Sequence, residues 1–489
     1  MVQCFIVLER YNMVKEEKKK KPLWVKLLIF YLCIVAYFLM FFAIGGKDVD
    51  LKRVETSKVT VSDNIGEILE GDIVEQKFIS EVSQIDSVNL SIGTYNRTNT
   101  GTLILELLQG NNSLNKTELN MEDLVNGDNE IAFSAPVEVT KGEEYTYKIS
   151  TRNASAGNSV TIYYGPQKSD GVSLVAKTVD LKKQELVFSI EGKVEEPLGK
   201  VFKYGTCVIL IALGVYLLHV LDYRKKGKMT IGLQFLYAVH QYTFLMEQLV
   251  IRAFKVRYKR SVLGVLWSFM NPLLTMIVQY FVFTLVFKSA IDHYIVYLLI
   301  GITFFNFYSE STNNGLLSII TNAALIKKVY VPKYIYPLSQ IFSAAINFVI
   351  SLILMFGITF ISGLHPNVYM LLIPYIIFCI FLLNIGVSLI LATGMTFFRD
   401  VQFINNVFMT MLTYATPLFW ELSMIPDKYL WIFKLNPLCN IITFVREIVL
   451  YNRYPGTELI LLSLVIPVIF LVLGIYVFKK NQDKFILFI

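Results

Sequence analysis

Long apolar runs alternate with polar segments along this chain. A helix needs about 20 apolar residues to cross the roughly 30 Å of hydrocarbon in a bilayer. The first run is longer than the apolar core of a cleaved signal peptide, so we interpret it as an uncleaved anchor. Eight runs of sufficient length predict eight transmembrane helices, at residues 23–44, 201–221, 262–286, 294–320, 336–361, 369–397, 403–420 and 458–478.

Residues 46–199, between the first two runs, follow a different pattern. Apolar and polar residues alternate there with a period of two, and turn residues such as Asn126-Gly127-Asp128 separate the segments. Such alternation predicts strands, and seven or eight short strands predict an antiparallel β-sandwich of the jelly-roll type. The alternating segments are residues 73–80, 87–95, 102–108, 129–135, 145–151, 159–164 and 185–192.

The function of this predicted sandwich stays open at this level. Its pattern resembles that of carbohydrate-binding sandwiches, but sandwiches host many functions, so a sugar-binding module and a structural or protein-docking module are both possible. Residues 46–199 contain no cysteine. The sandwich is therefore expected to depend on its own core and not on disulfides.

Lysine and arginine residues are concentrated in every second segment between the spans. Short basic loops remain in the cytoplasm. We therefore predict that both termini are cytoplasmic and that residues 46–199 are extracytoplasmic. The basic segments 1–22, 222–260, 325–335, 398–402 and 479–484 carry 22 Lys and Arg, against 5 in 287–293, 362–368 and 421–457.

The composition agrees with a membrane protein. Of the 489 residues, 54% are hydrophobic and only 17% are charged, whereas about 25% are charged in soluble domains. The predicted fold class is an α-helical polytopic membrane protein of about eight transmembrane helices with an inserted extracellular all-β sandwich. The net charge of +7 suits anionic lipid headgroups and gives no reason to expect nucleic acid.

The junction before the third span carries the most informative motif. Residues 257–273, RYKRSVLGVLWSFMNPL, join a cationic segment to an apolar span through Leu-Gly-x-x-Trp and Asn-Pro. This junction resembles the beginning of the membrane domain in ABC transporter permeases of the polysaccharide-export class. Those permeases move lipid-linked O-antigen, teichoic acid or capsular chains out of bacteria. The resemblance covers about residues 230–485, and typical members lack the first two spans and the sandwich.

The predicted organisation combines this resemblance with the hydropathy pattern. It consists of a cytoplasmic N-terminus (1–22), a transmembrane anchor (23–45), the extracellular sandwich (46–199), a transmembrane helix (200–222), a cytoplasmic amphipathic gate helix (223–260) and a six-span permease domain (261–489).

The segment before the junction predicts an amphipathic helix. Gln241, Gln248, Arg252, Lys255 and Lys259 fall on one stripe of a helical wheel, opposite a mainly apolar stripe. Taken alone, this pattern favours an anchor at the membrane surface. The resemblance implies instead a helix at the cytoplasmic gate that meets a lipid diphosphate. The gate candidates are Arg252, Lys255, Arg257, Lys259, Arg260 and Trp267.

Nothing in the chain fits the nucleotide-binding pattern G-x-x-x-x-G-K-[ST], so ATP hydrolysis is not expected here. The resemblance implies a separate ATPase, present in two copies and carrying ATP and magnesium, and a short coupling helix in loop 325–337. An ordinary basic turn, or an interfacial ion pair in the case of Arg399 and Asp400, is the alternative. The coupling candidates are Lys327, Lys328, Tyr330, Pro332, Lys333, Tyr334, Arg399 and Asp400, with Tyr336 as a further aromatic anchor.

Aromatic residues are frequent in the predicted permease domain. Aromatic rings can stack on the C–H faces of sugars, so they are candidates to line a glycan channel, although rings at span ends more often form interfacial belts. The channel candidates are Phe281, Phe283, Phe287, Tyr308, Tyr414 and Trp420.

Residues 421–455 predict two short outer helices separated by Asn436-Pro437. Arg446 and Glu447 lie in the second of them. An arginine at membrane depth is costly and is therefore usually functional or paired. A pair of Arg446 with Glu447 that closes the outer helices is the alternative to a functional role.

The sequence thus predicts a homodimeric permease subunit that exports a glycan linked to a polyprenyl diphosphate lipid through a bacterial plasma membrane. Drug or lipid efflux is the alternative within transporters. A membrane-embedded glycosyltransferase or ligase would need an outward-facing base, for which Asp292-His293 is the only tempting pair. Four histidines without HExxH or CxxC motifs argue against a metal site.

Overall fold

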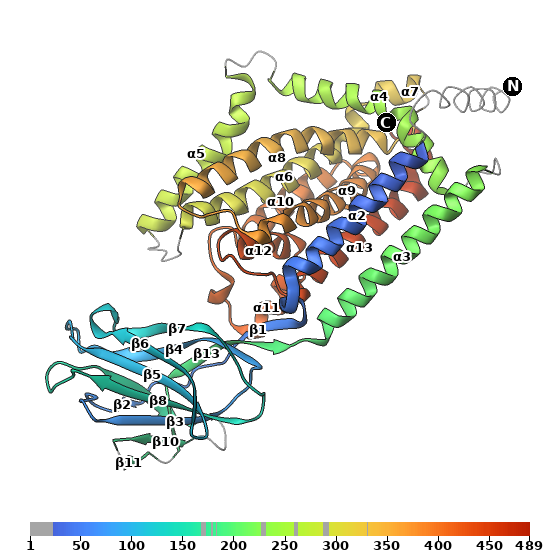
Figure 1. Cartoon of the computed structure of the whole chain (residues 1–489). Helices are drawn as coiled ribbons and strands as arrows, with labels where there is room; N and C mark the ends of the chain where they lie inside the picture. Colours follow the sequence, from blue (N-terminus) through green and yellow to red (C-terminus); the bar gives the residue numbers. More distant parts are fainter. Residues whose placement is uncertain are drawn as a thin grey trace. The chain divides into compact units, whose positions relative to one another are not determined.

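The computed structural model describes residues 23–167, 173–177, 179–181, 183–225, 231–258, 263–286, 293–329 and 331–489 (Figure 1). They form two compact units. Lys47–Lys200 make an all-β unit, and Met1–Gly46 together with Val201–Ile489 make a helical unit.

The all-β unit consists of two antiparallel sheets. One sheet has seven strands in the order β1-β13-β4-β9-β12, with β2 paired to β9 and β7 paired to β4, and the other has six in the order β11-β10-β3-β8-β5-β6. The strands are β1 (Leu51–Glu55), β2 (Asp63–Asn64), β3 (Ile73–Ile79), β4 (Gln84–Gly93), β5 (Thr102–Gln109), β6 (Asn112–Asn120), β7 (Gly127–Glu138), β8 (Glu144–Arg152), β9 (Thr161–Pro166), β10 (Ser173–Ala176), β11 (Val179–Asp180), β12 (Gln184–Leu186) and β13 (Phe188–Glu195).

The alternating pattern correctly predicted the inward positions of the long strands. In β3, Val74, Gln76 and Phe78 are buried between exposed or half-buried neighbours. Phe78 stacks on Tyr147 of β8 with ring centroids 4.5 Å apart, and Phe188 of β13 packs edge-on against both rings. Aromatic contacts of this kind add to the free energy gained by burying the rings.

The predicted number of strands was too low. β6 was missed because its sequence, NSLNKTELN, has no apolar face, yet it pairs with β5 along its whole length. The predicted segment 185–192 divides into β12, which pairs with β9, and β13, which pairs with β4. Strands as short as β2 and β11 span too few residues to show a period.

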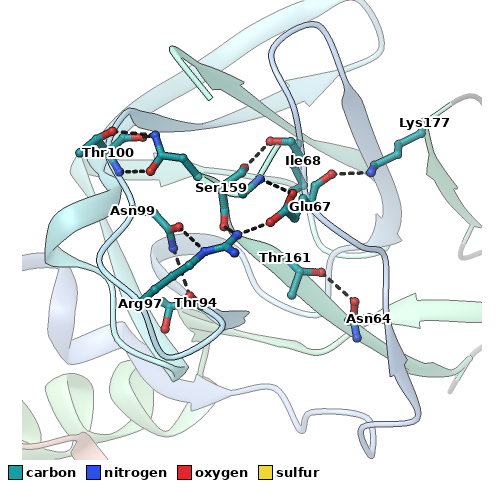
Figure 2. Close-up of polar contacts among 12 residues, drawn as sticks. Asn64, Glu67, Ile68, Thr94, Arg97, Asn99, Thr100, Ser159, Thr161 and Lys177 are labelled. Atoms are coloured by element: carbon teal, nitrogen blue, oxygen red, sulfur yellow. Dashed lines mark hydrogen bonds and ion pairs between the residues drawn. The ribbon is translucent and has the colours of Figure 1, made fainter. Parts of the chain in front are cut away.

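One end of the sandwich is closed by a polar loop cluster (Figure 2). The Glu67 carboxylate accepts hydrogen bonds from the Arg97 guanidinium and, at 2.9 Å, from the Gly157 backbone N–H. Arg97 also donates to the Asn99 side chain at 2.9 Å, and Lys177 donates to the Glu67 carbonyl. The carboxylate therefore joins three loops, and these two contacts lower the pKa of Glu67 below its ordinary value.

The helical unit contains a helix at each of the eight predicted spans. Its helices are α2 (Leu23–Gly45), α3 (Pro197–Lys225), α4 (Ile231–Tyr258), α5 (Trp267–Phe281) continued by a π-helical turn (Val282–Val286), α6 (Tyr294–Thr321), α7 (Ala323–Lys328), α8 (Ile335–Ile361), α9 (Ile373–Phe397), α10 (Val401–Ala415), α11 (Asp427–Lys434), α12 (Pro437–Val449) and α13 (Thr457–Asn481).

Within the described residues, five helices are long and apolar enough to cross a membrane, at Leu27–Asp50, Pro197–Tyr223, Ile335–Ile361, Val368–Phe397 and Thr457–Leu487. The protein is thus a multi-pass membrane protein. α6 has sufficient length but carries a polar stretch at residues 306–314. The predicted span 403–420 was too long, because α10 ends at Ala415 and Thr416 is extended before Pro417. A residue that precedes proline is disfavoured in the α conformation.

Close backbone contacts hold the helices together. A Cβ atom on Gly386 of α9 would lie 2.4 Å from the Phe470 backbone of α13, and one on Gly474 would lie 2.3 Å from the Gly386 carbonyl oxygen. Small residues allow such approach between membrane helices. The first span packs on the same bundle, where Phe41 is fully buried and contacts the ring of Tyr375.

α4 crosses the end of the bundle at which α7 and the C-terminus lie (Figure 1). Its Leu249 is buried in a cluster with Ile319, Ile326 and Tyr336 from α6, α7 and α8, and with Phe485 near the C-terminus. The apolar side of α4 therefore packs in part on protein, while Gln241, Gln248, Arg252 and Lys255 on the predicted polar stripe are exposed.

Candidate functional site

The centre of the helical unit contains one carboxylate. Glu310 lies near the middle of α6, and it is the only acidic residue in the sequences of α5, α6, α8, α9 and α10. A charged side chain inside a membrane segment is expensive and marks a functional site by default. The contacts of Glu310 therefore define the candidate site.

Glu310 joins four helices through polar contacts. Its Oε1 accepts a charge-assisted hydrogen bond from Arg257 at the end of α4, and another from Asn347 Nδ2 of α8 at 2.9 Å. Ser268 Oγ of α5 donates to Asn347 Oδ1 at 3.0 Å. The side chain of Glu310 is 25% exposed and that of Arg257 is 34% exposed, so water reaches the pair.

This network borders a cavity of about 500 Å³, which we call the Glu310 cavity. The volume lies in the range of small-molecule sites. Trp267 and Pro272 contribute its apolar wall. Besides the four residues of the network, its polar lining consists of Asn271, Asn306, Ser309 and Ser351.

A second cavity, of about 390 Å³, lies between α4, α6 and α8, and we call it the Arg252 cavity. Arg257 lines both cavities. No acidic residue is among the described residues that line the second one. Its polar lining consists of Arg252, Arg257, Asn314, Thr321, Asn322, Gln340 and Ser343.

The Leu-Gly-x-x-Trp motif has a local structural reason. Gly264 adopts φ of 50°, a left-handed conformation that favours glycine, and a short 3-10 turn from Gly264 to Leu266 leads into α5. The turn places Trp267 at the first position of α5, on the wall of the Glu310 cavity.

The predicted gate residues are thus divided. Arg252, Arg257 and Trp267 lie at the two cavities, whereas Lys255 is exposed and lines neither. Lys259 and Arg260 lie outside the described residues. Sequence reasoning missed Glu310 altogether, although a lone acid in a predicted span was a visible signal.

The predicted coupling loop contains the short helix α7. Lys327 and Lys328 are exposed at its end. Lys333, in contrast, donates to the Gln482 carbonyl at 2.6 Å and lies over the Phe485 ring. The prediction that Tyr336 offers a partner anchor was wrong, because its side chain is fully buried in the cluster below α4.

The other coupling candidates differ in exposure. Pro332 and Tyr334 are half-buried, and Tyr330 lies outside the described residues. Arg399 and Asp400 are both exposed in the turn between α9 and α10. Within the described part of the chain, no ion pair joins these two side chains.

The channel candidates also separate into groups. Phe281 and Tyr414 are exposed, by 56% and 71%. Phe283 stacks on Phe419 at 5.0 Å, and Trp420 packs edge-on against Phe433. Phe287 lies outside the described residues. Tyr308 is only 4% exposed in the single chain, and its place in a channel between two copies stays a prediction.

Arg446 of α12 stabilises the break after α10. Its buried guanidinium donates to the carbonyls of Pro417 at 2.5 Å and Leu418 at 3.2 Å, and it lies 3.3 Å above the Tyr297 ring. The next two carbonyls, of Phe419 and Trp420, accept from the hydroxyls of Tyr294 and Tyr297. Irregular backbone at membrane depth needs such internal partners.

Residues 245–450 match the family model described as ABC-2 type transporter. Two O-antigen export system permease proteins RfbA of Klebsiella pneumoniae are 32% and 33% identical to the chain over 246 residues. These alignments cover 50% of this chain and 95% of each relative. A third relative of the same name, from Myxococcus xanthus, is 30% identical over 249 residues and is covered to 96%. The chain belongs to the ABC-2 type transporter family and is a permease.

Proposed function

We propose that this chain is the transmembrane subunit of a bacterial ABC exporter that moves a polysaccharide, linked to a polyprenyl diphosphate lipid, out of the cytoplasm. The observation that carries the proposal is the similarity to O-antigen export permeases over 95% of their length. The polar Glu310 cavity inside the helical bundle supports it, since buried ionisable groups mark substrate paths in membrane proteins.

The Arg252 cavity supplies the chemistry that a diphosphate headgroup needs. Arginine binds phosphate through charge-assisted hydrogen bonds in a fixed fork. Arg252 and Arg257 lie at one cavity, and Trp267 lies beside the second. In this proposal, Lys255, Lys259 and Arg260 add to the positive potential on the cytoplasmic side.

ATP hydrolysis belongs to a partner ATPase, in two copies, which carries ATP and magnesium. The exposed side chains of Lys327 and Lys328 on α7, and of Arg399 and Asp400 in the turn after α9, would receive it. This chain needs no cofactor of its own in the proposal. Both termini and these turns would lie in the cytoplasm, and residues 46–199 outside.

Two copies of the chain would enclose the glycan path. α10 exposes large apolar side chains, among them Val407 at 72% and Tyr414 at 71%. In the proposed homodimer, part of this face meets the second copy, and Phe281, Phe283, Tyr414 and Trp420 contact the sugar rings. The sandwich, outside the membrane, would guide the polymer or recruit the enzyme that attaches it.

Depletion of this protein in its native cell tests the proposal. We expect full-length lipid-linked glycan to accumulate on the cytoplasmic side while surface polymer is lost, as measured by mass spectrometry of extracted lipids. An intact surface polymer without accumulation would contradict the proposal and favour drug or lipid efflux. Accumulation of truncated chains would favour the glycosyltransferase or ligase alternative.

A further inference from the structure

The arrangement of charges at the two cavities is unequal. The Arg252 cavity carries two arginines and no acid among its described lining residues. One of these arginines, Arg257, is engaged by Glu310 on the side of the other cavity. Within the described residues, Arg252 has no hydrogen-bond or ion-pair partner. A phosphate group that enters the Arg252 cavity therefore contacts the guanidinium of Arg252, which is available, and that of Arg257, which is already bonded to Glu310.

We propose that Glu310 is a resident counter-ion, which a phosphate-bearing anion in the Arg252 cavity displaces from Arg257. Arg252 makes the first contact with the anion. Arg257 then leaves Glu310 and completes a two-arginine site. The inference rests on the proposed function for the source of the anion, a lipid diphosphate, and assigns to Glu310 a role as a positioning residue.

The geometry makes the exchange feasible. Arg257 needs no movement of α4, because it already lines both cavities. Glu310 keeps the hydrogen bond from Asn347 when Arg257 leaves, and it is 25% exposed, so the carboxylate stays hydrated. Arg257 exchanges one charge-assisted partner for another of higher charge, and Arg252 adds a second charge-assisted contact that Glu310 does not have. A phosphate that two arginines hold can therefore outcompete the carboxylate.

Glu310 also explains selectivity in this scheme. A neutral lipid or an uncharged drug cannot replace the Glu310 carboxylate as the partner of Arg257, so the Arg257–Glu310 ion pair remains formed in their presence. Only an anion of high charge density gains enough from the second arginine to break the pair. Glu310 thus sets a charge threshold for access to the polar path along the Glu310 cavity.

Trp267 provides a direct readout. It lies on the wall of the Glu310 cavity together with Arg257, and the chain has only four tryptophans. A full-length variant in which Trp24, Trp420 and Trp431 are replaced by Phe leaves Trp267 as the only indole. Its fluorescence is titrated in phosphatidylcholine nanodiscs with inorganic pyrophosphate, with farnesyl diphosphate and with uncharged farnesol.

We expect both diphosphates to change the fluorescence of Trp267 and farnesol to leave it unchanged. Arg252→Gln should weaken binding by about tenfold or more, which corresponds to the loss of one charge-assisted contact. Glu310→Gln should tighten binding by about two- to fivefold, because the anion no longer competes for Arg257. Lys479→Gln, which removes an exposed charge at the end of α13 and lines neither cavity, is the matched control and should have no comparable effect.

A double variant isolates the displacement. In an Arg257→Gln background, Glu310→Gln should no longer tighten binding. If Glu310→Gln does not assemble, Glu310→Asp shortens the carboxylate arm and should tighten binding in the same direction. Unchanged or weaker binding in the Glu310 variants that assemble, or a persistent effect without Arg257, would overturn the inference.

The titrations also separate the sources of the anion and the two proposals. Tighter binding of farnesyl diphosphate than of pyrophosphate supports a lipid headgroup, and binding of pyrophosphate alone assigns the same site to a soluble anion. A response to phosphatidylglycerol nanodiscs without added ligand would assign it to bulk lipid and overturn the charge threshold. If depletion leaves surface polymer intact while the Glu310 variants still alter anion binding, the proposed export function is contradicted. The counter-ion role of Glu310 is then still supported. If depletion removes surface polymer but the diphosphates do not change the fluorescence of Trp267, the export function is supported and the counter-ion role of Glu310 is contradicted.

Discussion

The protein contains two ion pairs of almost identical local character in its two units. Glu67–Arg97 in the sandwich and Glu310–Arg257 in the helical unit show the same exposure, 25% for each glutamate and 34% for each arginine. Their surroundings differ. Both oxygens of Glu67 are bonded to loops of the sandwich, whereas Glu310 lies at a cavity and its arginine lines a second one.

Burial alone therefore does not reveal the role of a charge pair. Glu67 accepts from a backbone N–H as well as from Arg97, so its pair fixes loop geometry (Figure 2). Among the described residues, Glu310 accepts hydrogen bonds only from side chains, and its partners come from α4 and α8. The contacts of Glu67 suit a permanent structural ion pair, and those of Glu310 suit an ion pair that breaks when an anion binds.

The largest expected difference between the two pairs is in export. Glu310→Ala should lower surface polymer by about two- to fivefold, because Arg257 without its resident partner binds the diphosphate more tightly and releases it more slowly. Glu67→Ala should leave most export intact. Surface polymer is measured by quantitative carbohydrate analysis in cells that express each variant at equal levels. Similar losses in both variants would remove the distinction.

Charge reversal should separate the pairs by stability. The double variant Glu310→Arg with Arg257→Glu keeps an ion pair, and the Asn347 amide can turn to present its oxygen. Its melting temperature in detergent should stay close to that of the unaltered protein. The matched double variant Glu67→Arg with Arg97→Glu should melt at a lower temperature, because arginine cannot accept from the Gly157 N–H.

Equal melting of the two reversed proteins would contradict this assignment. The reversed membrane pair carries a further expectation. It places a carboxylate at the Arg252 cavity, so pyrophosphate should no longer change the fluorescence of Trp267 even though the protein is folded.

The sequence predicted the elements that carry the two ion pairs, but not the ion pairs themselves. The alternation in β3, β5 and β8 predicted the sandwich, and the apolar runs predicted the helices. The break at Pro417 could have been inferred from the residue itself. The contact of Glu310 with Arg257, 53 residues away, could not be inferred, because hydropathy carries no information on which helices pack together.

Backbone partners are equally hidden from sequence reasoning. Arg446 was expected to be functional or paired, and its donors reach carbonyls of Pro417, Leu418 and Tyr297. Every residue has a carbonyl, so the identity of its neighbours carries no signal for such a contact. The role of the Gly157 N–H in holding Glu67 was invisible for the same reason.

Low pH should have a smaller effect, on the stability of the loops that Glu67 joins in the sandwich. The pKa of Glu67 is lowered by the Gly157 N–H and by Arg97, so the pair stabilises the sandwich fully at pH above the unfolded pKa. This stability is lost as the pH falls below about 4.3, the ordinary glutamate value, and through the lower folded pKa. Limited proteolysis of the full chain should show faster cleavage of the 153–158 loop in that range.

The Glu67→Gln variant provides the control for this pH effect. It cannot ionise at position 67, so its cleavage of that loop should change less with pH. Equal pH profiles for the two proteins would show that another group controls the loop.

The smallest effect is expected at the partly exposed pair of Lys58 with Asp128, whose Nζ and Oδ2 atoms are 2.7 Å apart. Lys58→Gln should destabilise the protein by at most about 1 kcal/mol, the range of exposed ion pairs. Chemical unfolding followed by circular dichroism measures it. A larger loss would indicate that exposed pairs also hold the sandwich loops, and would weaken the contrast drawn from Glu67.

The contact between Gly386 and Gly474 has a consequence for motion. Packed helices usually slide past one another by small shifts, which the side chains between them absorb through changes of rotamer. At this crossing no side chain lies between the backbones of α9 and α13. Sliding of these two helices past one another is therefore restricted. A conformational change of the partner ATPase, transmitted at the turn after α9, would move α9 and α13 together as one rigid body.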